Sequence, residues 1–260
     1  VFSLTTFNKN GELLATSYGV FTSKDGEAIS LFTPFIGADS AIVIDAQGKM
    51  HEVDVLMGAN EIYDVCHFRV KGNTTPATLA TLHLATGEKA WQVGYALKKP
   101  EVTAFSVKKT EEFMGMYAFY QFNEVVEDNK LGCPIVNAQG EVVGLSQQAS
   151  STRDGQSTDA RYANSFVIEK GLDVNENVYQ RTGIRLDLPK QHQEALNLLV
   201  LANAGGQTRN YGKYIDDFIR LYPTSTDGYT MKAQFLVARE HFAQADAVMR
   251  EAIEKADDKE

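Results

Sequence analysis

The hydrophobic pattern of the chain changes once, near residue 171, and this change predicts a β part followed by an α part. Before it, short apolar or alternating runs are separated by turn residues, without convincing helical periodicity. About ten short strands at such spacing are typical of an all-β barrel or sandwich. Tight hairpins need positive φ, which glycine provides in Asp25-Gly26, Gln47-Gly48, Lys71-Gly72-Asn73 and Gln139-Gly140. The predicted strands cover residues 15–21, 28–32, 41–44, 51–56, 65–70, 89–97, 102–107, 117–124, 135–137, 142–146 and 162–167.

After Gly171 the apolar residues follow helical spacing. Pro189 can open a first helix, and Ala204-Gly205-Gly206 ends it. Three further helices are expected at 208–221, 227–239 and 242–256. We therefore predict two domains, 1–174 and 189–260, joined by a linker over residues 175–188.

The helical part has an internal period. One unit starts at His192 and the next at Thr226, which gives units of about 192–225 and 226–259 and a spacing of 34 residues. Small residues fall where the helices of the second unit must approach closely, at Ala233, Ala245 and Ala252. In the first unit the corresponding positions are larger: Leu199, Tyr211 and Phe218. The second unit resembles a tetratricopeptide repeat, and the alternative is an ordinary helical hairpin whose spacing is accidental.

Charge and composition exclude several classes of function. The chain has 25 Lys and Arg against 34 Asp and Glu, a formal net charge of −9, so a nucleic-acid partner is not expected. No apolar run reaches the roughly 18 residues of a membrane span. Residues 1–4 lack the charged and apolar regions of a signal peptide. We expect no metal site and no cofactor, because the chain has only two cysteines, Cys66 and Cys133, and its five histidines are scattered. A disulfide between the two cysteines is possible.

Three segments of the β part carry motifs in a fixed order. They read ATSYGVFTSKDG at 15–26 continued by AISLFT at 28–33, EIYDVCHFRV at 61–70, and NKLGCPIVNAQGEVVG at 129–144. Together they resemble the trypsin-like fold in its bacterial HtrA or DegP-like form. The resemblance implies a double six-stranded antiparallel β-barrel, with barrel 1 at about 1–75 and barrel 2 at about 85–170, followed by an all-α tetratricopeptide-like pair of helical hairpins. It also implies an extracytoplasmic protein, periplasmic or secreted.

The resemblance places the catalytic positions on residues that cannot catalyse. A serine protease needs a hydroxyl nucleophile, an imidazole base and a carboxylate that orients the imidazole. Here the nucleophile position is Leu131, the base position is Thr33, and only the carboxylate, Asp64, is present. The oxyanion turn has Asn129 in place of glycine, and asparagine tolerates the left-handed backbone. We expect no catalytic residues, and an inert hydrogen bond from Thr33 to Asp64 that satisfies the carboxylate.

An active peptidase with a different constellation is the alternative. Cys133 lies two residues after the nucleophile position and His67 lies three residues after Asp64, so a thiolate with an imidazole base can be imagined. Lys130 is a second candidate nucleophile. In the parent fold the position of Cys133 lies in the turn behind the nucleophile, which favours a buried and inert thiol.

Binding of a peptide or protein is the expected function. The resemblance implies a cleft strand at Asn164, Ser165 and Phe166, where a peptide could add as a further strand. The inner face of the second helical unit would present a mostly polar surface for a ligand. Its expected binding residues are Asp227, Thr230, Gln234 and Val237.

The first helical unit presents apolar residues on the equivalent face, Leu196 and Val200. We expect this unit to dock on the β domain, because two repeats are fewer than the roughly three that are usually needed for stability. A third hypothesis is a structural module of a larger envelope assembly, in which the β domain is only a scaffold.

Overall fold

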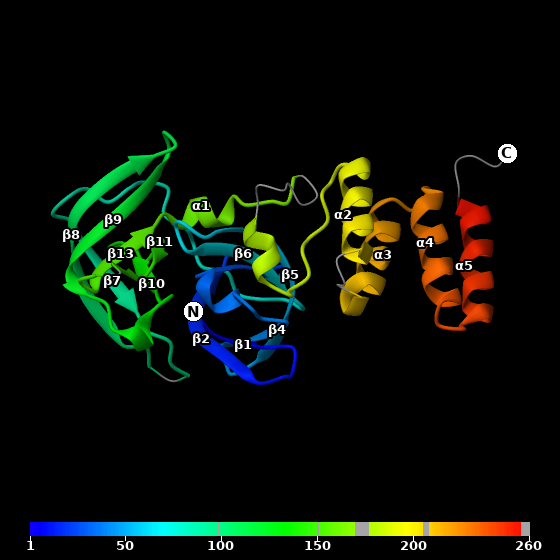
Figure 1. The fold of residues 1–260 in the computed structure, drawn as a ribbon. Helices are drawn as coiled ribbons and strands as arrows, with labels where there is room; N and C mark the ends of the chain where they lie inside the picture. The colour runs from blue at the N-terminus through cyan, green and yellow to red at the C-terminus, as the bar shows by residue number, and fades with distance from the viewer. Residues whose placement is uncertain (98, 150, 170–176, 205–207, 256–260) are drawn as a thin grey trace. The chain divides into compact units, whose positions relative to one another are not determined.

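The computed structural model describes residues 1–97, 99–149, 151–169, 177–204 and 208–255. The chain divides into two compact units (Figure 1). The first consists of Val1–Val167 and Asn177–Leu186, and the second of Ile168–Glu176 and Asp187–Glu260. The strands are β1 Phe2–Phe7, β2 Leu13–Phe21, β3 Glu27–Ser30, β4 Ser40–Asp45, β5 Met50–Asn60, β6 Val65–Val70, β7 Lys89–Val93, β8 Val102–Phe113, β9 Tyr117–Val125, β10 Pro134–Val136, β11 Val142–Leu145, β12 Gln147–Gln148 and β13 Asp154–Thr158. The helices are α1 Ala160–Asn164, α2 His192–Ala204, α3 Thr208–Leu221, α4 Thr226–Val237 and α5 Phe242–Lys255, with 3₁₀ helices η1 Thr33–Phe35, η2 Asp128–Lys130 and η3 Asn177–Arg181.

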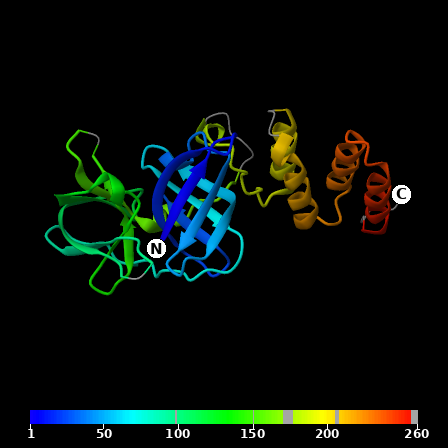
Figure 2. The ribbon, with the colours of Figure 1, turned by 90° about the horizontal axis from the view of Figure 1, so that it is seen from below.

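The first six strands form a closed antiparallel barrel in the order β1-β2-β3-β6-β5-β4, which Figure 2 shows in blue and cyan. Strand β1 pairs with both β2 and β4 and so closes the barrel. Alternate residues of β1 point inward, and Phe2 and Leu4 are fully buried. The Phe2 ring centroid lies 4.8 Å from that of Phe21 and 6.0 Å from that of Phe68. Aromatic side chains therefore fill this barrel.

The turn glycines have the backbone that the sequence predicts. Their φ angles are 93° at Gly26, 80° at Gly48, 89° at Gly72 and 79° at Gly140. This is the region that residues with a Cβ rarely adopt. The predicted hairpins at Gly26, Gly48 and Gly140 are therefore confirmed, since each connects two paired strands. Gly72 is not in a hairpin, because it follows β6, and the next strand, β7, belongs to the other sheet.

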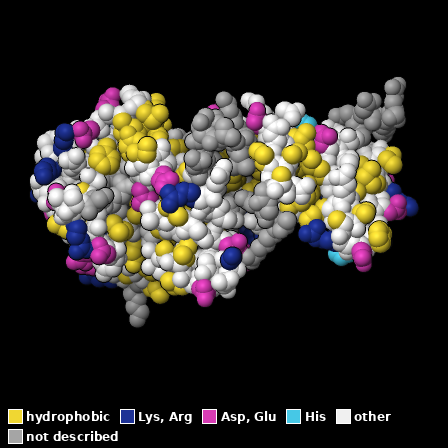
Figure 3. Space-filling model, viewed as in Figure 1, with side chains coloured by type: hydrophobic (Ala, Val, Ile, Leu, Met, Phe, Trp, Pro, Cys, Tyr) yellow, Lys and Arg dark blue, Asp and Glu magenta, His cyan; other side chains and the backbone are white. Residues whose placement is uncertain are grey.

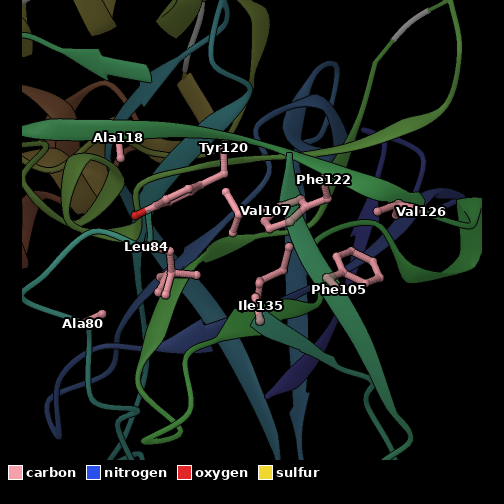
Figure 4. Close-up of a cluster of buried hydrophobic side chains, with 11 residues drawn as sticks. Ala80, Leu84, Phe105, Val107, Ala118, Tyr120, Phe122, Val126 and Ile135 are labelled. Carbon is pink, nitrogen blue, oxygen red and sulfur yellow. The ribbon is translucent and has the colours of Figure 1, made fainter. Parts of the chain in front are cut away.

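The remaining strands form a second antiparallel sheet in the order β11-β10-β7-β8-β9-β13-β12. An isolated bridge from Gly144 to Asp159 nearly closes it into a barrel. Its core includes Phe105, Tyr120 and Phe122, and each of these side chains is almost fully buried (Figure 4). The sheet has seven strands where six were expected, because the segment 142–148 is split into β11 and β12 at Ser146. The Ser146 hydroxyl donates to the Lys130 carbonyl at 2.6 Å, and the Ser146 N–H donates to the Cys133 carbonyl at 2.8 Å.

The prediction of a strand at 162–167 is wrong. The structure has the short helix α1 there, and the Asp159 carboxylate caps it by accepting the Arg161 backbone N–H at 2.9 Å. The last strand is β13, which the sequence does not predict because its residues, DGQST, are polar although mostly buried. Strand β1 also lies outside the predicted strands.

Part of the predicted linker, 175–188, packs on the first barrel. The Arg181 carbonyl accepts the Gly37 N–H at 2.6 Å, and the Arg185 carbonyl accepts the Leu56 N–H at 2.8 Å. The Arg185 guanidinium also pairs with Asp54 at 2.7 Å. Residues 177–186 therefore belong to the first unit, whereas 170–176 lie outside the described residues.

The second unit contains α2 to α5, which follow one another as packed neighbours. Helices α2 and α4 begin at His192 and Thr226, where the sequence places the starts of the two units. Helices α3 and α4 approach closely at Gly228, where an added Cβ would lie 2.8 Å from the side chains of Phe218 and Ile219. Among the described helices, none has the length and apolar character to cross a membrane.

Candidate functional site

The Asp64 carboxylate accepts a hydrogen bond from the main chain of the same protein. Its Oδ1 accepts the Thr33 backbone N–H at 2.7 Å. The expected bond between these two residues is thus confirmed, with the main chain as its donor. Thr33 begins η1, whose second residue is Pro34, and the first N–H groups of such a helix need partners outside it. Asp64 itself has φ 46°, a left-handed conformation that aspartate tolerates better than most residues.

Leu131 lies at the junction of the two sheets. It is half-buried and packs both against the core of the second sheet and against a cluster to which both barrels contribute. We call this second set the junction cluster. Leu31, two residues before Thr33, and Tyr63, directly before Asp64, belong to it or pack on it. The structure thus brings the neighbourhoods of Thr33, Asp64 and Leu131 to one apolar cluster. The buried members of the junction cluster are Val20, Ile29, Leu31, Val65, Val142, Leu145, Ala160, Tyr162 and Ala163.

The backbone around Leu131 differs from the expected oxyanion turn. Asn129 lies inside η2, and it is Gly132 that has the left-handed backbone, with φ 85°. The Lys130 N–H donates to Glu127 O at 2.9 Å, and the Gly132 N–H donates to Ser146 O at 2.8 Å. The backbone N–H groups of Lys130 and Gly132 therefore donate hydrogen bonds to carbonyls of the protein itself.

Two residues of barrel 1 hold this turn. The Ser17 hydroxyl donates to the Leu131 carbonyl at 3.1 Å. A Cβ on Gly132 would lie 2.6 Å from both the Ser17 Oγ and the Tyr18 carbonyl oxygen. The loop that carries the nucleophile position thus presses directly on strand β2, and only glycine fits there.

Cys133, the alternative nucleophile, is buried and lacks a base. Burial raises the pKa of its thiol to about 11, although the Tyr95 backbone N–H and the Lys130 charge act in the opposite direction. His67, the imagined base, uses Nδ1 toward the Phe166 carbonyl at 2.9 Å, and its Nε2 lies 3.4 Å from Glu27. The Lys130 ammonium is paired with Glu101. None of the contacts of the described residues joins the thiol to an imidazole.

Gln147 ties the Asp64 loop to the second sheet, and sequence reasoning missed it. Its Nε2 donates to the carbonyls of Tyr63 at 2.6 Å and Asp64 at 3.2 Å. Its Oε1 in turn accepts the Thr158 hydroxyl at 3.1 Å. The polar pair Gln147-Gln148 gives no motif that could have predicted this contact.

Aromatic rings cover the junction cluster beside Asp64. Tyr63 stacks on Phe113 at 4.5 Å between centroids, and Tyr162 meets Phe113 edge-on at 5.0 Å. Met114 and Met116, at the end of the β8–β9 hairpin, are 73% and 58% exposed. Apolar side chains accordingly gather at the end of this hairpin on the face shown in Figure 3. Separation in sequence hides the group, because Tyr63 and Phe113 lie in different barrels.

The residues expected to form a cleft strand take other positions. Asn164 is the last residue of α1, and Ser165 caps that helix. The Ser165 hydroxyl donates to the Tyr162 carbonyl at 2.7 Å. The Phe166 ring packs edge-on against Tyr162 at 4.7 Å. This segment therefore offers no extended strand edge of the expected kind.

The residues expected on the inner face of the helical unit are all exposed on α4: Asp227, Thr230, Gln234 and Val237. Gln234 lines a pocket of 190 Å³ together with Tyr211, Phe235 and Arg239. The Arg239 guanidinium lies over the Phe235 ring, 3.6 Å from its centroid. Asp227 instead lies beside His192, 3.6 Å from its Nε2. The sequence thus identifies one residue of this pocket and misses its aromatic and cationic walls.

Across the described residues, no three His, Cys, Asp or Glu side chains are grouped so that they could hold a metal ion. Cys66 and Cys133 are both free and buried. No model of a known protein family and no curated protein matches the sequence.

Proposed function

We propose that the chain is a catalytically inactive homologue of HtrA-type, trypsin-like proteases that carries tetratricopeptide-like repeats and binds a peptide or protein segment outside the cytoplasm. The carrying observation is the hydrogen bond from the Thr33 N–H to Asp64, together with Leu131 packed in the junction cluster. The base position is Thr33, so the Asp64 carboxylate has no imidazole there to orient, and its Oδ1 accepts the Thr33 main-chain N–H. The site then contains neither a nucleophile nor a base.

The second candidate, a peptidase that uses Cys133, has less support. A thiol with a pKa of about 11 is almost entirely protonated at neutral pH. A cysteine nucleophile needs the thiolate and a base within hydrogen-bond reach. His67, the base that this hypothesis requires, contacts Phe166 and Glu27 instead.

Binding is supported by surface features in each unit. The first exposes Met114 and Met116 beside stacked aromatic rings, and flexible thioethers adapt to varied apolar partners. The second has the pocket lined by Gln234, Phe235 and Arg239, which combines an amide, a ring and a cation. A peptide needs such a mixture of apolar contact and a few polar groups.

The test is binding without cleavage. We expect fluorescently labelled peptides from a casein digest to bind the full chain in an anisotropy titration and to remain intact by mass spectrometry after prolonged incubation. Gln234→Arg should weaken binding about fivefold by filling the α4 pocket with charge. Gln244→Arg, the same exchange at an exposed position of α5, is the matched control and should leave the affinity unchanged.

Cleavage of the peptides would overturn the inactive assignment. Absence of binding would overturn the peptide-binding role and favour the scaffold hypothesis. Equal effects of the two arginine variants would remove the α4 pocket from the proposal.

A further inference from the structure

A second pocket lies on the outer face of the second sheet, and no part of the proposed function uses it. It has a volume of 590 Å³ and is bordered by residues of the loop before β7, of β7 itself and of the β10–β11 turn. The residues that matter for its chemistry are Trp91, Glu88, Glu141, Lys89, His83 and Asn137.

Trp91 is the only tryptophan of the chain, and it points away from the core. Strand β7 alternates, with Ala90 and Gln92 buried while Lys89 is exposed and Trp91 is half-buried. The strand pairs with β8 and β10, so neighbours on both sides fix the backbone beneath the indole. The π face of an indole attracts cations.

Two carboxylates of the pocket are held in place by hydrogen bonds. Glu88 accepts the Ala85 backbone N–H through Oε2 at 2.7 Å. Glu141 accepts the Asn137 side-chain amide through Oε2 at 2.8 Å. Asn137 is itself fixed, because its Oδ1 accepts the backbone N–H groups of Gln139 and Glu141 at 3.0 and 2.9 Å. Both carboxylates are therefore ordered before any ligand arrives, which lowers the entropy cost of binding.

The cations near the pocket already have partners. The Lys89 ammonium donates to the Ser106 hydroxyl at 2.7 Å. Arg161 fixes the loop that carries His83 by donating to the Thr81 carbonyl at 2.9 Å, and its own charge is balanced by Asp159 at 2.6 Å. The charges of the lining side chains are thus two carboxylates against one ammonium, in a chain whose net charge is −9.

We propose that this pocket binds a guanidinium or ammonium group presented by a basic peptide segment, with the cation over the Trp91 indole and between Glu88 and Glu141. Cation–π attraction and charge-assisted hydrogen bonds both favour such a group over a neutral one. The site is independent of the junction cluster and of the α4 pocket, so it stands or falls separately from the proposed function.

The single tryptophan makes the test direct, because it gives one indole cross-peak in a ¹H–¹⁵N correlation spectrum of the full chain. We expect acetyl-Ala-Arg-Ala-amide to shift this peak in a saturable manner at millimolar concentration, whereas acetyl-Ala-Ala-Ala-amide leaves it in place. Spermidine is titrated in parallel, so that a free polyamine can be distinguished from a peptide as the source of the cation. Maltotriose tests whether the pocket takes sugars instead.

Charge variants identify the carboxylates. Glu88→Gln and Glu141→Gln should each weaken binding of the arginine peptide about fivefold, and each glutamine keeps an oxygen for the existing hydrogen bond. Glu111→Gln, an exposed carboxylate of β8 outside the pocket, should have no effect. The proposal is overturned if the indole peak stays in place, if it responds equally to the alanine peptide or to maltotriose, or if all three variants bind alike.

Discussion

Gly132 holds a position where both its backbone and its surroundings exclude a side chain. Its φ is 85°, and an added Cβ would lie 2.6 Å from the Ser17 hydroxyl and from the Tyr18 carbonyl oxygen. Gly132→Ala should therefore lower the free energy of unfolding by about 3 kcal/mol, measured by urea denaturation. Gly140→Ala is the control, since φ is 79° there but nothing lies within 4 Å, and it should cost about 1 kcal/mol. Equal losses would contradict the close contact between this turn and β2.

The thiol of Cys133 should be inert in the folded protein. With a pKa of about 11, roughly one molecule in a thousand carries the thiolate at pH 8. Burial also raises the pKa of Cys66. We expect neither cysteine to react with iodoacetamide under native conditions, and both to react after denaturation in guanidinium, as read by intact mass. Rapid native alkylation at Cys133 would revive the peptidase hypothesis.

Asp45 makes the stability of barrel 1 depend on pH. Burial alone would raise the pKa of its carboxyl group, but hydrogen bonds from the Lys49 backbone N–H and the His51 ring outweigh this and lower it. A lowered pKa adds stability above the unfolded-state pKa of roughly 3.9, and this stability is lost as the pH falls through the folded-state pKa. Asp45→Asn should thus cost about 1 kcal/mol at pH 7 and less at about pH 3. The same loss at both pH values in urea titrations would argue against this linkage.

At the scale of elements, Asp159 joins α1 to the second sheet. Its carboxylate, buried to 2% exposure, accepts the Ala118 backbone N–H at 3.2 Å and pairs with Arg161, which also donates to the Met116 carbonyl. Asp159→Asn should destabilise the protein by about 3 kcal/mol, because a partly buried guanidinium loses its counter-charge. Asp128→Asn, which breaks the exposed pair with Arg153, should leave the urea midpoint nearly unchanged. Similar midpoints for both variants would show that the buried pair does not hold α1.

Most strands are predictable because each is a short apolar or alternating run between clear turn signals. At β6 the predicted and observed bounds agree. Helix α3 is likewise placed at its predicted bounds. Helix α1 is too short for helical periodicity to register, and its identity depends on the Asp159 cap and its bond to Arg161. Strand β13 stays hidden because its partners, β9 and β12, rather than its own polar residues, make it a strand.

Some features of the candidate site can likewise be predicted from the sequence, and others cannot. The motif resemblance points to Thr33, Asp64 and Leu131, and the structure places their neighbourhoods at the junction cluster. It does not reveal that Asp64 takes the Thr33 main-chain N–H, because this depends on how η1 begins. The Gln147 contacts also arise only when the two sheets meet, and no local pattern marks them.

At the scale of the whole molecule, the chain combines a unit of two barrel-like sheets with a unit of four helices. The docking of the first helical unit on the β domain stays a prediction. Each unit has its own candidate binding surface, so a partner could be held by either without the other. Titrations of the Gln234→Arg and Glu88→Gln variants with the same partner would distinguish these possibilities.

Covalent labelling tests the central claim, that the site lacks a nucleophile, most directly. The full chain is incubated with a fluorophosphonate probe under native conditions, with active trypsin as the positive control, and its intact mass is measured. We expect no adduct, because Leu131 has no nucleophilic atom and Asp64 has no imidazole to orient. A stoichiometric adduct on one residue, located by peptide mapping, would contradict the account.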